Sequence, residues 1–189
     1  MSGLSYLEVV AEFRSGILKE KKALRFCCEG VSMNPVLKNG DEIQVTRVPL
    51  SDLHFGDIVT HEIDGSFITH RFFYIKQKDG LNFLTIKADN SFKFDQSVSS
   101  SSFVGKVAQI FYSDGTINIL ASGWQSMSRL IAALSFIEGV FFGLLHATKR
   151  SVFRTIPVNN RLKQRTKNFL RKPKQWLLRF LLFFFHRHI

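Results

Sequence analysis

The chain has 189 residues, of which 45% are hydrophobic and 22% charged, and Phe alone contributes 20. This length predicts one domain, or one domain with an appendage, and the composition excludes a chain that is disordered throughout. Cys27 and Cys28 are the two cysteines, which excludes a disulfide framework. The formal net charge of +11, taken over the whole chain, fits either nucleic acid or a membrane surface as partner.

The positive charge is concentrated in the last third of the chain. Residues 1–120 contain 13 Lys/Arg and 14 Asp/Glu, whereas residues 121–189 contain 13 Lys/Arg and one acid, Glu138, a net charge of +12. Such asymmetry is typical of an interaction segment attached to a globular part. We therefore expect three units, which are residues 1–22, a folded domain over residues 23–122, and a basic, apolar, helical tail over residues 123–189.

The first unit predicts a helix, and the second predicts strands. Residues 4–18 have apolar side chains at helical spacing, interrupted by charges, which indicates an amphipathic helix and not an export signal, so the expected compartment is the cytoplasm. Between residues 23 and 120, short apolar runs separated by turn residues predict an antiparallel, mainly β domain. Strands are expected at residues 24–28, 43–48, 58–59, 67–75, 83–86, 104–111 and 117–120, with Asp-Gly hairpins at 64–65, 79–80 and 114–115. The serine-rich residues 97–102 predict a flexible loop.

The third unit predicts membrane contact. Residues 130–148 are apolar and just long enough to cross a bilayer, but a central Glu138 would cost roughly 2.5–3.5 kcal/mol there. Residues 176–185 are too short to span and, with aromatic and basic side chains, predict an interfacial segment. We expect residues 130–189 to bind an anionic membrane surface, with the cytoplasmic face favoured and a single pass through residues 130–148 as the alternative; nucleic acid is disfavoured. The other alternative is that both stretches pack on the β domain as core.

Residue types that support nucleophilic catalysis occur in separate short phrases of the β domain. Ser32 lies on a tight segment after a predicted strand, His70 lies inside a strand, and Asp89 and Asp95 follow. A serine needs a base to become a nucleophile, histidine suits that role near neutral pH, and an acid that fixes the imidazole tautomer completes the set. Because most chains contain these residue types, an ordinary strand histidine is the alternative for His70.

Six phrases in one order make the set more specific: GVSMNP at residues 30–35, LKNGD at 37–41, GDIV at 56–59, ITHR at 68–71, KADN at 87–90 and VGKV at 104–107. Over about residues 24–120 the series resembles the S24/S26 serine peptidases, the superfamily of type I signal peptidases and LexA-like self-cleaving repressors. The pair His70-Arg71 is similar to the endoplasmic-reticulum and archaeal type of signal peptidase, in which histidine stands where other members have a lysine base.

The resemblance implies a LexA/signal peptidase-like β fold and a serine endopeptidase that removes a leader or signal segment from precursor proteins. It makes Ser32 the nucleophile, with its backbone N–H in the oxyanion site, and His70 the general base. It makes Asp95 the third member and Asp89 a supporting acid, and the two acids could exchange roles. Residues Gly30, Met33 and Pro35 are expected to contact the substrate, an extended segment of a precursor. No cofactor and no metal is implied.

Two other functions compete with this one. A LexA-like self-cleaving regulator would need a DNA-binding module, for which too few residues precede Ala23, and a lysine base. A non-catalytic membrane- or nucleic-acid-binding protein would keep the fold without using the Ser/His/Asp set.

Overall fold

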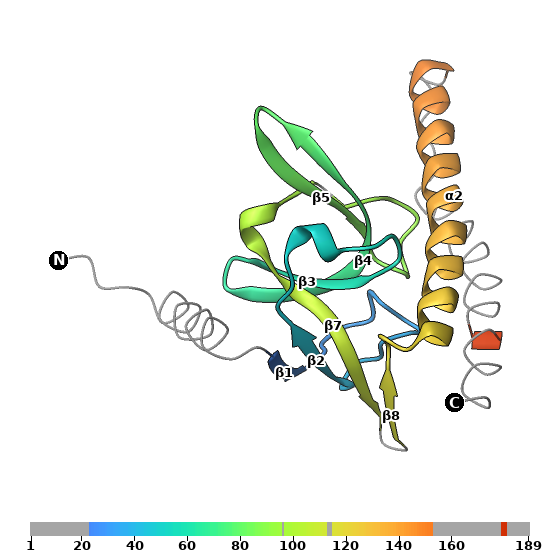
Figure 1. The fold of residues 1–189 in the computed structure, drawn as a ribbon. Coiled ribbons are helices and arrows are strands. Elements are labelled where there is room, and N and C mark those ends of the chain that lie inside the picture. Colours follow the sequence, from blue (N-terminus) through green and yellow to red (C-terminus); the bar gives the residue numbers. More distant parts are fainter. Residues whose placement is uncertain (1–22, 96, 113–114, 153–178, 181–189) are drawn as a thin grey trace.

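The computed structural model describes residues 23–95, 97–112, 115–152 and 179–180, so the expected N-terminal helix and most of the basic tail lie outside the described residues. Within this part, eight strands form one sheet, and one long helix follows them (Figure 1). The elements in chain order are β1 (Ala23–Cys27), β2 (Glu42–Thr46), η1 (Leu50–Asp52), β3 (Ile58–Ile63), β4 (Ser66–Lys78), β5 (Leu81–Lys87), β6 (Val98–Ser99), η2 (Ser100–Ser102), β7 (Phe103–Tyr112), β8 (Gly115–Asn118) and α2 (Ser122–Val152). The predicted mainly β fold with a C-terminal helix is confirmed.

The sheet is antiparallel, with the strand order β1-β2-β7-β3-β4-β5-β6 and β8 paired to β7. Asp64-Gly65 joins β3 to β4, with φ of +50° and +74°, and Asp79-Gly80 joins β4 to β5, with φ of +51° and +75°. Two successive positive φ angles characterise the type I′ turn that Asp-Gly favours, because this turn matches the twist of the strands. These two hairpins are as predicted, whereas residue 114 of the third lies outside the described residues.

The serine-rich patch differs from its prediction as a flexible loop. Val98 and Ser99 form β6, which pairs with β5, and residues 100–102 form a turn of 3-10 helix. Val98 is buried in a core cluster with Val59, Phe72 and Leu84. One apolar residue among serines is therefore enough to attach this segment to the edge of the sheet, because its side chain fills the core.

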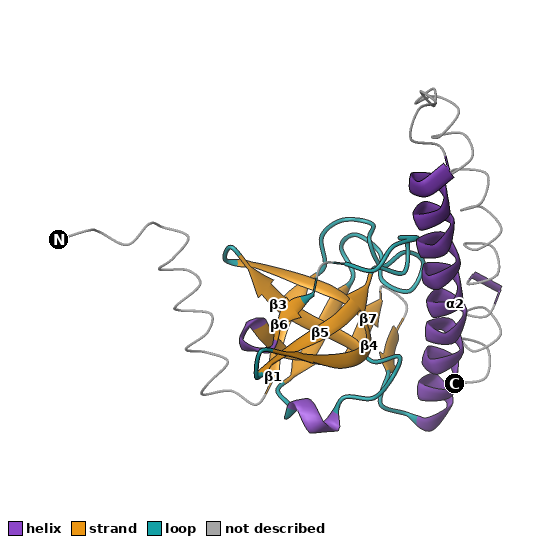
Figure 2. Cartoon of the chain, turned by 90° about the horizontal axis from the view of Figure 1, so that it is seen from above, coloured by secondary structure: helices purple, strands orange, loops and turns teal. Residues whose placement is uncertain are grey.

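The first half of α2 belongs to the core of the β domain. Trp124, Met127 and Ile131, at helical spacing, are buried against side chains of β2, β7 and β8, which include Ile43, Val45, Val107, Ile110 and Ile117. Figure 2 shows α2 standing beside the sheet. The expected boundary at residue 123 falls in the first turn of this helix, and the helix begins well before the apolar stretch that the sequence indicates. For this half, the alternative of core packing describes the structure.

Two buried cations of the sheet bind α2. Lys87 Nζ, at the end of β5, donates to Ser135 Oγ at 2.5 Å and to Glu138 Oε2 at 3.0 Å. Arg71, in β4, donates to Ser128 Oγ at 2.5 Å. Glu138, the acid that makes a membrane span costly, therefore faces the β domain, where an ion pair compensates its charge.

By length and composition, α2 is able to cross a membrane. Its residues Ser122–Leu144 have a mean hydropathy of 1.6, and 33% of the most apolar window is buried inside the protein. The buried part of this window is the side of α2 that packs in the core of the β domain.

Candidate active site

Ser32 lies on the turn that follows β1, where the chain bends back toward β2. Gly30 has φ of +88°, a conformation that L side chains rarely adopt, and its N–H donates to Asn39 Oδ1 at 2.8 Å. Met33 is buried in the core cluster, whereas Ser32 is exposed. The turn is thus anchored on one side by an apolar side chain and presents its serine on the other.

Asn90 holds the serine turn against the segment that follows β5. Its backbone N–H donates to the Ser32 carbonyl at 2.8 Å, and its side-chain Nδ2 donates to the Val31 carbonyl at 3.1 Å. Both bonds leave the Ser32 hydroxyl and N–H uncommitted to Asn90. Asn90 closes the KADN phrase beside Asp89, and no role for it was predicted from the sequence.

His70 and Asp95 meet in the structure. His70 Nδ1 lies 2.5 Å from Asp95 Oδ2, and both side chains are partly exposed. An ionised carboxylate only accepts hydrogen bonds, so Nδ1 carries the proton and Nε2 keeps its lone pair. The backbone N–H of Asp95 donates to the Ile86 carbonyl at 3.0 Å, which fixes the acid beside the end of β5. This arrangement prepares Nε2 to act as a base.

Asp89 lies elsewhere and binds a different partner. Arg71 Nε and Nη2 each donate to one oxygen of Asp89 at 2.7 Å, and both side chains are completely buried. The remaining Nη1 of Arg71 donates to the Gly56 carbonyl at 2.8 Å and to Ser128. The two acids of the sequence prediction therefore have separate positions: Asp95 contacts His70, and Asp89 contacts Arg71.

An aromatic cluster supports the segment that carries Asp95. The Phe94 ring lies 5.2 Å from the Phe73 ring and 5.6 Å from the Phe136 ring of α2, measured between centroids. A Cβ at Gly139 of α2 would come within 2.6 Å of the Phe94 ring, so only glycine admits this ring at its observed position. Helix α2 is therefore part of the frame that places Asp95, a role that the sequence did not indicate.

The structure brings together some of the expected site residues and leaves others apart. His70 and Asp95 are in contact, and Ser32 is tied through Asn90 to the segment that holds Asp89. Within the described part of the chain, the Ser32 hydroxyl makes no hydrogen bond to His70. Catalytic hydrogen bonds are often long before a substrate is bound and tighten in the reacting complex.

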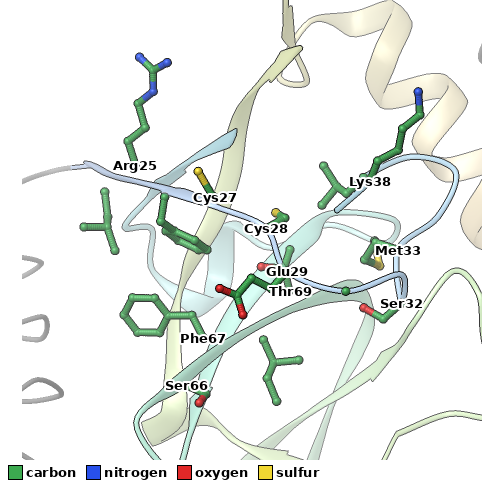
Figure 3. Close-up of a pocket in the computed structure, with 15 residues that line it drawn as sticks. Arg25, Cys27, Cys28, Glu29, Ser32, Met33, Lys38, Ser66, Phe67 and Thr69 are labelled. Atoms are coloured by element: carbon green, nitrogen blue, oxygen red, sulfur yellow. The ribbon is translucent and has the colours of Figure 1, made fainter. Parts of the chain in front are cut away.

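A cleft of about 560 Å³ adjoins Ser32 (Figure 3). Its walls are β1 with the serine turn on one side and residues 66–69 of β4 on the other, and Gly30 and Met33 are among the lining residues. Pro35, also expected at the substrate, is buried and lies outside that set. Among the described strands, β1 pairs only with β2, and β4 pairs only with β3 before Arg71. Among the described strands β1 is therefore an edge strand, the kind of edge to which an extended peptide is able to bind.

His61 lies behind His70 and is neutral at physiological pH. Its ring centroid is 6.1 Å from that of His70, and its buried Nδ1 has no hydrogen-bond partner among the described residues. The pKa of His61 is lowered to about 4, mainly because the ring is buried and also because His70 lies beside it, while Asp95 acts in the opposite direction. His70 therefore adjoins a second imidazole that carries no charge near neutral pH.

Cys28, beside the cleft, is a thiol that burial keeps protonated. Burial raises the pKa of the Cys28 thiol to about 12, with Asp41 and Cys27 adding to the effect, so Cys28 stays protonated near neutral pH. In the part of the chain that the structure describes, no group of three or more His, Cys, Asp or Glu side chains is placed to hold a metal ion.

No family model and no curated protein matches the chain.

Proposed function

We propose that this chain is a serine endopeptidase of the signal peptidase I type, in the S24/S26 superfamily, that cleaves a leader or signal segment from precursor proteins. The observation that carries the proposal is the contact between His70 Nδ1 and Asp95 Oδ2, at 2.5 Å, in a domain whose Ser32 is exposed and borders a cleft. The order of the six sequence phrases from residue 30 to residue 107 agrees with the same assignment.

In the proposed reaction, Ser32 Oγ attacks the carbonyl carbon of the scissile peptide bond while His70 Nε2 takes the hydroxyl proton. Asp95 holds the imidazole in the tautomer that leaves Nε2 free and stabilises the imidazolium that forms. The backbone N–H of Ser32 donates to the oxyanion. The C–N bond then breaks, the amine leaves with the proton from His70, and an acyl-enzyme remains on Ser32. A water that gives its proton to His70 hydrolyses the ester and restores the hydroxyl.

The cleft fits a substrate in extended form. An added strand is able to hydrogen-bond to the edge of β1, in the manner of β-augmentation. Its side chains would alternate between the two walls, each of which includes one phenylalanine: Phe26 on β1 and Phe67 on β4, with ring centroids 5.3 Å apart. Binding of this kind recognises mainly the peptide backbone of the substrate. It suits an enzyme that cuts a segment of a precursor while that segment is still unfolded.

A cleavage assay tests the peptidase proposal. A diverse pool of synthetic peptides would be incubated with the wild-type protein, Ser32→Ala and His70→Gln, and new termini would be identified by mass spectrometry. We expect both variants to lose at least 10³-fold in rate, because removing any triad member leaves only the residual catalysis of the site. His54→Gln, an exposed histidine in the turn before β3, is the control and should keep full activity. Equal cleavage by the wild type and Ser32→Ala would refute the proposal.

We further propose that the protein associates with the cytoplasmic face of an anionic membrane, with α2 along the surface and not across the bilayer. The inner side of α2 packs in the domain core and binds Lys87, whereas its outer side presents Leu130, Leu134, Ile137 and Phe141, which are 40–67% exposed. These exposed residues recur at intervals of three and four, so they form one stripe. Residues 149–189, which follow the stripe, contain only basic charges, and cations of this kind are attracted to anionic headgroups.

Vesicle flotation tests the membrane proposal. The full chain is expected to float with vesicles that contain phosphatidylserine and much less with phosphatidylcholine alone. Leu134→Gln with Ile137→Gln, both on the outer side of α2, should reduce flotation several-fold without changing the unfolding transition. Flotation that is the same with and without the anionic lipid, and the same in the wild type and the variant, would refute the proposal. If protease added to either side of the vesicle membrane left residues 145–152 intact, the result would instead support a helix that spans the bilayer.

A further inference from the structure

The cleft contains one charge that faces the substrate space. Of its lining residues, three are charged at neutral pH: Arg25, Glu29 and Lys38. A charge placed beside a bound peptide selects that peptide by its own charge, and the effect grows as the cleft is desolvated. Whether each of these side chains points into the cleft therefore decides which peptide charge the cleft prefers.

The two basic residues point out of the cleft. Arg25 forms an ion pair with Glu42, at 2.6 Å, and its guanidinium lies 3.7 Å above the Phe111 ring, so it is held on β2 and β7. The ammonium group of Lys38 is directed away from the space between β1 and β4 (Figure 3). Neither cation therefore neutralises the interior of the cleft.

Glu29 points into the cleft. Its carboxylate extends from the end of β1 toward Phe67 on the opposite wall (Figure 3). No hydrogen bond or ion pair to Glu29 is present among the described residues. The aromatic pair of Phe26 and Phe67 lies at this part of the cleft, so a bound peptide would exclude water from the carboxylate and leave it in need of a cation.

We propose that Glu29 determines the specificity of the cleft, by selecting peptides that carry Lys or Arg within about three residues of the cleaved bond. The reach follows from chain geometry: Glu29 precedes Ser32 by three residues, so their Cα atoms are at most about 11 Å apart, a span that an extended peptide covers in about three residues. A lysine or arginine at this distance lays its aliphatic stem along the pair of Phe26 and Phe67 and places its charge against Glu29. The inference rests on the proposed function, because it deepens the substrate class of the same site.

The first test is a charge exchange at residue 29. The wild-type protein, Glu29→Gln and Glu29→Lys would each digest a pool of synthetic peptides, and residue frequencies would be counted at the three positions on either side of each new terminus. We expect the wild type to favour Lys or Arg about tenfold over Asp or Glu at one of these positions. Glu29→Gln should abolish this preference and Glu29→Lys should reverse it, while the control Asp52→Asn, an exposed acid outside the cleft, keeps it. The same preference in all variants would overturn the inference.

The second test does not depend on cleavage. Ser32→Ala, alone and combined with Glu29→Lys, would be titrated with two fluorescent peptides rich in Val and Ala that differ only by a central Lys or Glu. Tighter binding of the Lys peptide to Ser32→Ala, reversed by Glu29→Lys, supports the inference even if the wild type cleaves nothing, in which case only the peptidase proposal fails. Equal affinity of both peptides in both proteins would overturn the role of Glu29, whatever the cleavage assay shows.

Discussion

His70 and Arg71 are consecutive residues of β4 and bind two different acids, Asp95 and Asp89. Successive side chains of a strand point to opposite faces, so the first is directed to the partly exposed site and the second to the buried interior. The His-Arg pair of the sequence therefore contains one residue to which we assign the proposed chemistry and one that binds a buried acid.

Loss of the Asp95 carboxylate should affect catalysis far more than folding. Asp95→Asn would no longer hold the tautomer with the proton on Nδ1, so we expect kcat/KM to fall by about 10³–10⁴. The partly exposed position predicts a change of about 1 kcal/mol or less in the free energy of unfolding. The two readouts are peptide cleavage and urea denaturation, and Asp52→Asn is the matched control. A near-normal kcat/KM in Asp95→Asn would rule out the acid assignment.

Loss of the Asp89 carboxylate should do the opposite. Asp89→Asn leaves the buried guanidinium of Arg71 without a counterion, which costs about 3–5 kcal/mol. The exposed pair of Arg25 and Glu42 offers a comparison, since Arg25→Ala should cost less than about 1 kcal/mol. Chemical denaturation measures both. A double variant, Asp89→Asn with Arg71→Met, is expected to be less destabilised than the sum of the singles, and strict additivity would contradict a direct pair.

The buried His61 predicts a pH dependence of stability. Its pKa is about 4 in the folded protein and 6.5 in the unfolded chain, so between these values only the unfolded chain binds the proton. The free energy of unfolding should therefore fall as the pH drops from 6.5 to about 4, by on the order of 3 kcal/mol from this group.

His61→Phe removes the titrating group and should flatten this slope in urea denaturation curves recorded across the window. His54→Gln, at an exposed turn, should keep the wild-type slope. Equal slopes for the wild type and His61→Phe would show that His61 is not the group responsible.

Two glycines of α2 test whether the helix positions Asp95. Gly139→Ala places a Cβ within 2.6 Å of the Phe94 ring, whereas Gly143→Ala meets no atom within 4 Å. We expect Gly139→Ala to move Phe94 and lower kcat/KM about tenfold, since displacement of a catalytic group by a fraction of an ångström is costly. Gly143→Ala should leave activity unchanged and raise stability by up to about 1 kcal/mol, because alanine favours helix. Equal activities in peptide cleavage would show that α2 does not position the acid.

The sequence predicted what is encoded locally. The alternation of Ile43 and Val45 indicated β2, and the Asp-Gly pairs gave the turns, because only a few residue types adopt positive φ. It could not assign the two acids from spacing alone, since Asp89 and Asp95 both follow β5 and their partners lie 18 and 25 residues earlier in the chain.

The burial of α2 was predicted only as the alternative to membrane contact, for a related reason. Lys87 and Glu138 are 51 residues apart in the sequence. The residues near Glu138 therefore give no sign that this acid, in an apolar stretch, has a cation as its partner in the fold. Residues 122–129 look polar, yet the spacing of Trp124, Met127 and Ile131 contains the helical periodicity that would have revealed the buried face.

The turn at Asp64-Gly65 has a consequence for how the protein tolerates change. It sets the register of β4 against β3, in which Val59 lies opposite His70 and Ile58 lies opposite Arg71. A slip of one residue would exchange the two faces, bringing a guanidinium to Asp95 and an imidazole to Asp89. We therefore expect the insertion or deletion of one residue between this hairpin and His70 to disrupt both the His70–Asp95 contact and the buried Arg71–Asp89 pair.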